Sequence, residues 1–132
     1  MRKLVDQFGL EYVIPEIEGK LSVGRNSGCN VVIPPVSARQ NPDFYTLLSS
    51  SPEVREKAKN RYGGVSRIHA TIFTDNGKTF ISDGSAFGMG NERSSNGTFV
   101  DHVSVNATHP GELRSGSIVH LGKLRLTYGE GK

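Results

Sequence analysis

Hydrophobic and polar positions alternate over short stretches of this chain, which is the pattern of β-strands with one buried face. The stretch at 68–73 reads Ile-His-Ala-Thr-Ile-Phe. As an extended strand it would place Ile68, Ala70 and Ile72 on one face and His69, Thr71 and Phe73 on the other. A second stretch, at 123–128, alternates strictly between apolar residues and Lys, Arg or Thr.

Further strands are indicated wherever a short apolar run is bounded by turn-forming residues. The Asn76-Gly77 pair predicts a tight hairpin, because it supplies two positive φ angles at little cost. Sixteen glycines fit a fold with many tight turns. We therefore expect an all-β sandwich or barrel, with strands near 3–5, 10–14, 20–23, 30–33, 68–73, 78–83, 96–100, 103–105, 117–121 and 123–128.

Residues 36–64 break the β pattern and favour helix. Asn41 followed by Pro42 predicts a capped helix over 42–48. Ser51 and Pro52 predict the start of a second helix, which the Gly63-Gly64 pair would end. We interpret this segment as a helical hairpin inserted into a loop; a partly ordered surface excursion is the alternative.

The composition narrows the class of protein. The 132 residues are enough for one domain with its own core, and 35% hydrophobic residues make the chain neither membrane-like nor disordered. The single cysteine, Cys29, forms no internal disulfide and fits a reducing, cytoplasmic setting. No apolar run is long enough to cross a membrane, so no membrane partner is expected. A net charge of +3 is compatible with nucleic acid but argues weakly for it.

Three loop clusters at predicted strand ends carry the candidate chemistry. They are Gly24-Arg25, the run 66–69 with the sequence Ser-Arg-Ile-His, and the run 94–98 with the sequence Ser-Ser-Asn-Gly-Thr. In this order, with β segments between them, they resemble the forkhead-associated (FHA) domain. The run 111–122 is similar to the closing strands of that family, and the resemblance covers about 19–129.

The resemblance implies a two-sheet β-sandwich of about eleven strands, to which our reading of the residues adds 36–64 as a small helical insertion. It also implies a module that binds phosphothreonine peptides through loops at one end of the sandwich. The implied ligand-binding residues are Arg25, Ser66, Arg67, Ser95 and Asn96, supported by Gly24, His69, Gly97 and Thr98. A phosphate carries about −1.5 to −2 charges near pH 7, which a guanidinium fork and hydroxyl donors can match.

Other classes of function fit the residues less well. His69 beside Ser66, with Asp83 as a third member, suggests a hydrolase, but the chain has no nucleophile-elbow motif. The remaining histidines, His102, His109 and His120, lack the spacing of metal ligands, so no metal or cofactor is expected. We expect a non-catalytic module that binds substrates of a Ser/Thr kinase. A phosphate-independent scaffold on the same fold is the alternative, and nucleic-acid binding ranks below both.

Four departures from the family pattern bear on the site. The segment 36–64 lengthens the loop leading into Ser66. It is predicted to form part of a peptide groove or a second protein interface, or else to cover the site. The loop 84–95 is long and carries Phe87, Met89 and Arg93 as further candidate contacts. Asp101-His102 stands where the family usually has Asn-Gly, and Ser117 where aspartate is common.

Overall fold

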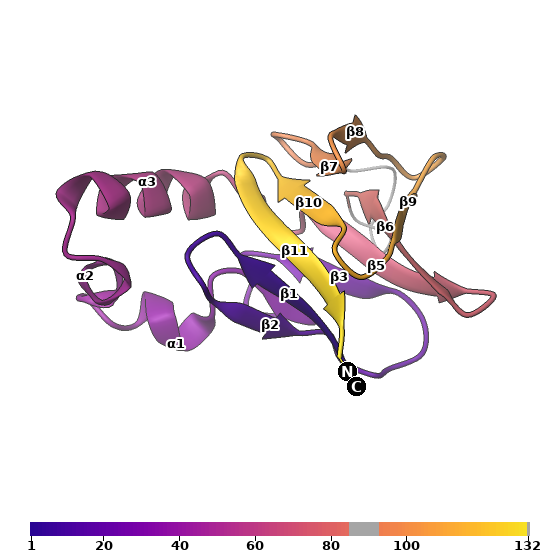
Figure 1. The fold of residues 1–132 in the computed structure, drawn as a ribbon, viewed down its shortest axis with the longest axis horizontal. Helices are drawn as coiled ribbons and strands as arrows, with labels where there is room; N and C mark the ends of the chain where they lie inside the picture. Colours follow the sequence, from indigo (N-terminus) through magenta and orange to yellow (C-terminus); the bar gives the residue numbers. More distant parts are fainter. Residues whose placement is uncertain (85–92, 132) are drawn as a thin grey trace.

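Eleven strands in the described part of the chain form two sheets that pack face to face (Figure 1). The computed structural model describes residues 1–84 and 93–131. The strands are β1 (Arg2–Asp6), β2 (Glu11–Val13), β3 (Leu21–Gly24), β4 (Val31–Val32), β5 (Ala70–Asp75), β6 (Lys78–Asp83), β7 (Thr98–Val100), β8 (Val103–Ser104), β9 (Gly111–Leu113), β10 (Ile118–Leu121) and β11 (Leu124–Glu130).

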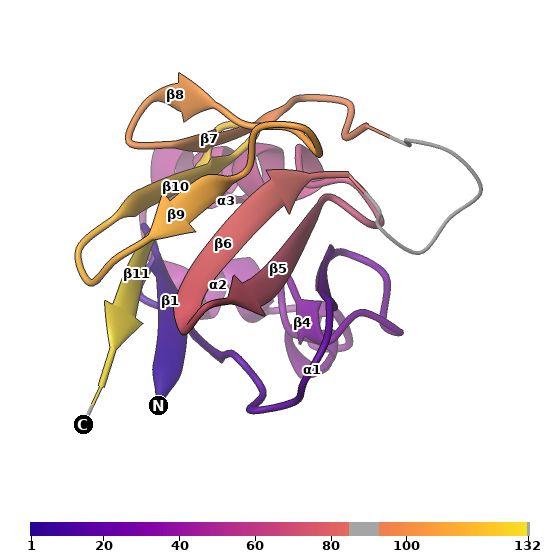
Figure 2. The same cartoon turned by 90° about the vertical axis from the view of Figure 1, so that its right-hand side faces the viewer.

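One sheet has six strands in the order β2-β1-β11-β10-β7-β8, and the other has five in the order β4-β3-β5-β6-β9. The pairs are antiparallel, apart from the parallel pair of β3 and β4. Figure 2 looks onto β5, β6 and β9, with the helices behind them. The predicted two-sheet sandwich is confirmed, and neither sheet closes into a barrel.

The alternation predicted for the last strand is confirmed. Leu124, Leu126 and Tyr128 of β11 are fully buried, whereas Lys123, Arg125 and Thr127 are exposed or at the surface. The turn between β5 and β6 is also as predicted, with φ of 51° at Asn76 and 75° at Gly77. Both features depend on neighbouring residues alone, which is why the sequence predicts them well.

The prediction for 68–73 is partly wrong. Strand β5 begins at Ala70, and Ile68 lies in the turn before it. The polar side is buried as deeply as the apolar side, because His69 and Thr71 are both fully inaccessible. Their polar atoms are satisfied inside the protein: the Thr71 hydroxyl, for example, donates to the carbonyl of Gly84 at 2.8 Å.

Three helices lie between β4 and β5, namely α1 (Val36–Arg39), α2 (Phe44–Leu48) and α3 (Pro52–Gly63). Ser51 caps α3 as predicted, since its hydroxyl accepts from the backbone nitrogen of Val54 at 3.4 Å. The predicted cap at Asn41 is wrong. Its side chain accepts from the nitrogen of Asp43 at 2.9 Å and forms a turn, so α2 begins later than expected. Helix α1 was not predicted.

The helices gather at one side of the sandwich (Figure 1), and α2 and α3 pack on it through an aromatic cluster. Tyr62 of α3 is 1% exposed and its ring contacts those of Phe8, Phe44 and Tyr45. Ala58, one turn earlier, is fully buried. This buried face makes α3 part of the core, so the alternative of a partly ordered surface excursion is wrong for this helix.

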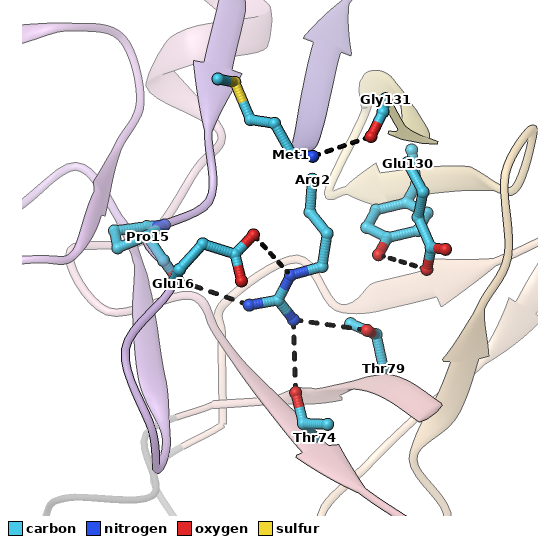
Figure 3. A network of polar contacts seen from close by, with 9 residues as sticks. Met1, Arg2, Pro15, Glu16, Thr74, Thr79, Glu130 and Gly131 are labelled. Carbon is cyan, nitrogen blue, oxygen red and sulfur yellow. Dashed lines mark hydrogen bonds and ion pairs between the residues drawn. The ribbon is translucent and has the colours of Figure 1, made fainter. Parts of the chain in front are cut away.

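A polar network around Arg2 joins the two sheets (Figure 3). The guanidinium of Arg2, on β1, donates to the hydroxyls of Thr74 and Thr79 at 3.3 Å each, and these lie on β5 and β6. Next to it the Met1 amino group donates to the carbonyl of Gly131 at 2.8 Å. The two ends of the described chain therefore lie side by side. No helix within the described residues has the length and hydrophobicity needed to span a membrane.

Candidate functional site

A hollow of about 630 Å³ lies where the loops after β3, before β5 and before β7 meet. All five residues predicted to bind the ligand, Arg25, Ser66, Arg67, Ser95 and Asn96, border it. The hollow is also lined by Asn26, Gly63, Gly64, Val65, Ile68 and Arg93. The fold thus brings together three clusters that are far apart in the sequence.

Gly24 allows the first two clusters to touch. The backbone nitrogens of Arg25 and Asn26 donate to the carbonyls of Ser66 and Arg67 at 3.1 and 3.0 Å. A Cβ atom at position 24 would lie only 2.2 Å from the carbonyl oxygen of Arg67. Glycine is therefore required here for the close approach of two backbones.

Arg25 is half-buried, and its side chain is held from the end of α3. Its Nε–H donates to the backbone carbonyl of Val65, the second residue after the helix. This bond uses Nε alone, so the two terminal NH₂ groups still form a fork that can meet two oxygens of a phosphate. The fixed Nε gives that fork a defined orientation at the hollow.

His69 holds the loop that carries Ser66. Its Nδ1 accepts from the backbone nitrogen of Ser66 at 2.9 Å, so the proton of the neutral ring is on Nε2, which donates to the carbonyl of Gly97 at 2.8 Å. Burial lowers the pKa of His69 and favours this neutral form. The Ser66 hydroxyl accepts from the nitrogen of Ser95 at 3.0 Å, which leaves its own hydrogen to donate to a ligand.

This geometry argues against a hydrolase. In a catalytic triad the histidine accepts the serine hydroxyl proton and is oriented by an acid. Here Nδ1 is engaged by the backbone of Ser66, and Nε2 faces Gly97. The carboxylate of Asp83 instead accepts from the hydroxyls of Ser94 and Thr98, at 2.5 and 2.6 Å.

Asp83 is thus a supporting residue that the sequence reasoning missed. It was considered only as a third member of a triad, yet it anchors both ends of the third cluster, and its second oxygen accepts from the nitrogen of Ser94 at 3.1 Å. The Ser94 hydroxyl in turn accepts from the nitrogen of Gly97 at 2.8 Å. No local pattern pairs residue 83 with residues 94 and 98, so the sequence offered no signal for it.

Asn96 connects the third cluster to the helical segment. Its Nδ2 donates to the carbonyl of Gly64 at 2.8 Å, which leaves one amide hydrogen and the carbonyl oxygen for a ligand. The turn between β10 and β11 lies against this contact, because a Cβ on Gly122 would be 3.0 Å from that of Asn96. The nitrogen of Gly122 also donates to the carbonyl of Gly97 at 2.8 Å.

The charges around the hollow favour an anion. Arg25, Arg67 and Arg93 line it, and no aspartate or glutamate is among its described lining residues. The end of the helical segment, Gly63 and Gly64, forms part of the wall, whereas 36–62 contribute nothing to the described lining. Of the additional contacts predicted from the loop 84–95, Arg93 borders the hollow, and Phe87 and Met89 fall outside the described residues.

The two remaining departures, at Asp101-His102 and at Ser117, are accommodated locally. Asp101 and His102 adopt φ of 48° and 69° in the turn between β7 and β8, which are left-handed values like those that Asn-Gly pairs supply. The Asp101 carboxylate secures the turn by accepting from the nitrogen of Ile118 at 2.9 Å. The hydroxyl of Ser117 accepts from the nitrogen of Arg114 at 2.9 Å. Within the described residues no group of three or more His, Cys, Asp or Glu is placed to hold a metal.

Comparisons with known proteins identify the family and the fold. A family model for the FHA domain matches residues 21–122. A structure from work on phosphothreonine-dependent FHA domain interactions is 20% identical, with a TM-score of 0.60 over 99% of this chain and 97% of that one. The MEK1 FHA domain in complex with a phosphothreonine peptide of HOP1 is 16% identical, with a TM-score of 0.54 over 99% and 97%.

Mycobacterium tuberculosis EmbR in complex with a low-affinity phosphopeptide is 20% identical, with a TM-score of 0.58 over 99% of this chain and 25% of that one. No curated protein sequence matches this chain. The family match spans most of the chain, and the sandwich is that of the solved relatives. The chain therefore belongs to the FHA domain family, a family of non-catalytic phosphothreonine-binding modules.

Proposed function

We propose that this protein binds phosphothreonine-containing proteins and thereby mediates regulated protein–protein interaction downstream of a Ser/Thr kinase. The observation that carries the proposal is the convergence of Arg25, Ser66, Arg67, Ser95 and Asn96 on one hollow with three guanidiniums and no described carboxylate. A phosphate needs several convergent donors and positive charge, and these residues supply both.

Each residue has a distinct role in the proposal. The Arg25 fork meets two phosphate oxygens, and the Ser66 hydroxyl donates to a third. Arg67 adds positive charge, and Ser95 donates to the phosphate. Asn96 uses its remaining amide hydrogen and its oxygen on the peptide backbone next to the phosphothreonine. His69, Gly24, Gly97 and Thr98 keep these groups in place.

The relatives support the ligand class, because the MEK1 FHA domain and EmbR are both solved with phosphopeptides. We further propose that 1–132 form a single domain, in which 36–64 are an insertion into the loop before Ser66. A cytoplasmic setting suits the proposal, since Ser/Thr kinases and a free thiol at Cys29 both belong to a reducing compartment.

The test is a degenerate phosphothreonine peptide library, with phosphoserine and unmodified libraries as controls. We expect selective retention of phosphothreonine peptides. Arg25→Ala should weaken binding by about 1.5–3 kcal/mol, because it removes a charge-assisted contact. Arg125→Ala, which removes an exposed arginine of β11 outside the described lining of the hollow, is the matched control and should bind as the wild type does.

The same peptide libraries, together with a separate nucleic-acid binding assay, distinguish the proposal from its alternatives. Equal retention of modified and unmodified peptides, unaffected by Arg25→Ala, would indicate a phosphate-independent scaffold. Retention of DNA or RNA with a steep salt dependence would indicate a nucleic-acid-binding protein. Either result would overturn the proposal.

A further inference from the structure

Two side chains of the proposed phosphate site are held by consecutive backbone carbonyls directly after α3. Asn96 Nδ2 donates to the carbonyl of Gly64 at 2.8 Å, and Arg25 Nε donates to the carbonyl of Val65. The two side chains come from different loops, 71 residues apart in the numbering (96 − 25). Their relative placement therefore depends on where the end of α3 lies.

The end of α3 is itself closed by backbone bonds. The nitrogen of Gly64 donates to the carbonyl of Asn60 at 3.1 Å, and that of Val65 donates to the carbonyl of Tyr62 at 3.1 Å. Val65 is fully buried. A displacement of the last helical turn would thus carry the Gly64 and Val65 carbonyls with it.

Tyr62 fixes that last turn to the six-stranded sheet. Its hydroxyl donates to Oδ2 of Asp6 at 2.6 Å, and Asp6 is 4% exposed on β1. The other carboxylate oxygen accepts from the nitrogens of Phe8 and Leu10, at 2.8 and 3.1 Å. Burial together with the Asp6 carboxylate raises the pKa of Tyr62, so its phenol stays a donor at physiological pH.

We propose that Tyr62 is a positioning residue for the phosphate site, acting from Asp6 through the end of α3 onto Arg25 and Asn96. The end of α3 then orients two ligand-binding side chains of the site, Arg25 and Asn96. This inference rests on the proposed function. It concerns the orientation of two ligand-binding side chains, and a small misplacement of such groups costs affinity even when every contact residue is present.

The chain contains a matched control on the same carboxylate oxygen. Tyr12 of β2 also donates to Oδ2 of Asp6, at 2.8 Å, and is 5% exposed. Tyr12→Phe and Tyr62→Phe each remove one buried hydroxyl from the same acceptor, so both should lower stability by a similar amount. Only Tyr62 belongs to α3, the helix that ends at Gly63 and is followed by the Gly64 and Val65 carbonyls.

Two readouts distinguish positioning from general destabilisation. For a phosphothreonine peptide retained by the wild type, we expect Tyr62→Phe to weaken affinity about tenfold and Tyr12→Phe to leave it nearly unchanged. In the free protein, we expect the NMR signals of the Arg25 Nε–H and the Asn96 side-chain amide to move in Tyr62→Phe and to stay in place in Tyr12→Phe.

The outcomes separate this inference from the proposed function. If the wild type binds no phosphopeptide, the proposed function fails, while the two NMR signals still decide whether Tyr62 positions Arg25 and Asn96. Equal losses of affinity in both variants, or unmoved signals in Tyr62→Phe, would overturn the inference. If Tyr62→Phe does not fold, Asp6→Asn replaces it, because it weakens the same hydrogen bond between Tyr62 and residue 6. Asp6→Asn should move the same two NMR signals. Unmoved signals would again overturn the inference.

Discussion

The imidazole of His69 and the backbone of Ser66 are joined by a hydrogen bond in which the ring accepts, with Nδ1 and the nitrogen 2.9 Å apart. Only a neutral ring with Nδ1 unprotonated can make this bond. Protonation would turn an acceptor into a second donor facing an N–H group. The conformation of the loop that presents the Ser66 hydroxyl is therefore coupled to the charge of a buried histidine.

The first prediction concerns pH and stability. The pKa of His69 is lowered in the folded protein from 6.5, so below that pH the unfolded chain binds more protons. The neutral His69 ring thus contributes its full share to the free energy of unfolding above pH 6.5. This contribution is lost as the pH falls from 6.5 through the folded-state pKa of His69. One such group contributes a slope of at most about 1.4 kcal/mol per pH unit.

Urea unfolding between pH 5 and 8 measures this slope. His69→Gln should reduce the dependence of the unfolding free energy on pH. Part of that dependence should remain because of His120, whose pKa is also lowered by burial and by its neighbours His102 and Arg125. His109→Gln, at an exposed loop position outside the described lining of the hollow, is the matched control for the substitution itself. An unchanged slope in His69→Gln would argue against the coupling.

Gly24→Ala tests the close approach of two loops. The new Cβ would meet the Arg67 carbonyl oxygen at 2.2 Å, so the loops must separate. We expect a loss of about 1–3 kcal/mol in the free energy of unfolding and weaker phosphopeptide binding. Gly129→Ala, where a Cβ has no neighbour within 4 Å, should be close to neutral. Calorimetry and peptide titration of both variants provide the comparison.

Arg25→Lys tests whether geometry or charge matters at the first loop. Lysine keeps the charge but has no Nε–H for the Val65 carbonyl and no planar fork. We expect a loss in binding free energy near that of Arg25→Ala, about 1.5–3 kcal/mol. Arg67→Lys should be milder, because exposed Arg67 is expected to contribute charge. Equal affinities for Arg25→Lys and the wild type would show that charge alone suffices.

Asp83→Asn tests the anchor of the third loop. The carboxylate accepts from two hydroxyls and one backbone nitrogen, and an amide would place a donor against one of them. We expect a loss of about 1–3 kcal/mol in unfolding free energy. Asp75→Asn, at the exposed end of β5, is the control and should change stability little. If Asp83→Asn unfolded at the same midpoint as the wild type, Asp83 would not be a residue that supports the third loop.

Local chemistry explains which predictions succeeded. The Asn76-Gly77 turn, the alternation of β11 and the Ser51 cap of α3 each depend on residues within a few positions of one another. Asn41 shows the limit of such rules, because the same side chain that caps helices also closes turns. Nothing nearby in the sequence decided between the two.

By itself, the sequence determined the all-β class, the helical character of 36–64 and the choice of five candidate residues that turn out to border the hollow, since motif order and periodicity are properties of the chain. Only the tertiary structure decided how those residues are held. Asp6 and Tyr62 are 56 positions apart, and Arg25 and Val65 are 40 apart. A hydrogen bond across such a separation exists only once the two sheets and α3 have packed, because packing alone brings its donor and acceptor within bonding distance.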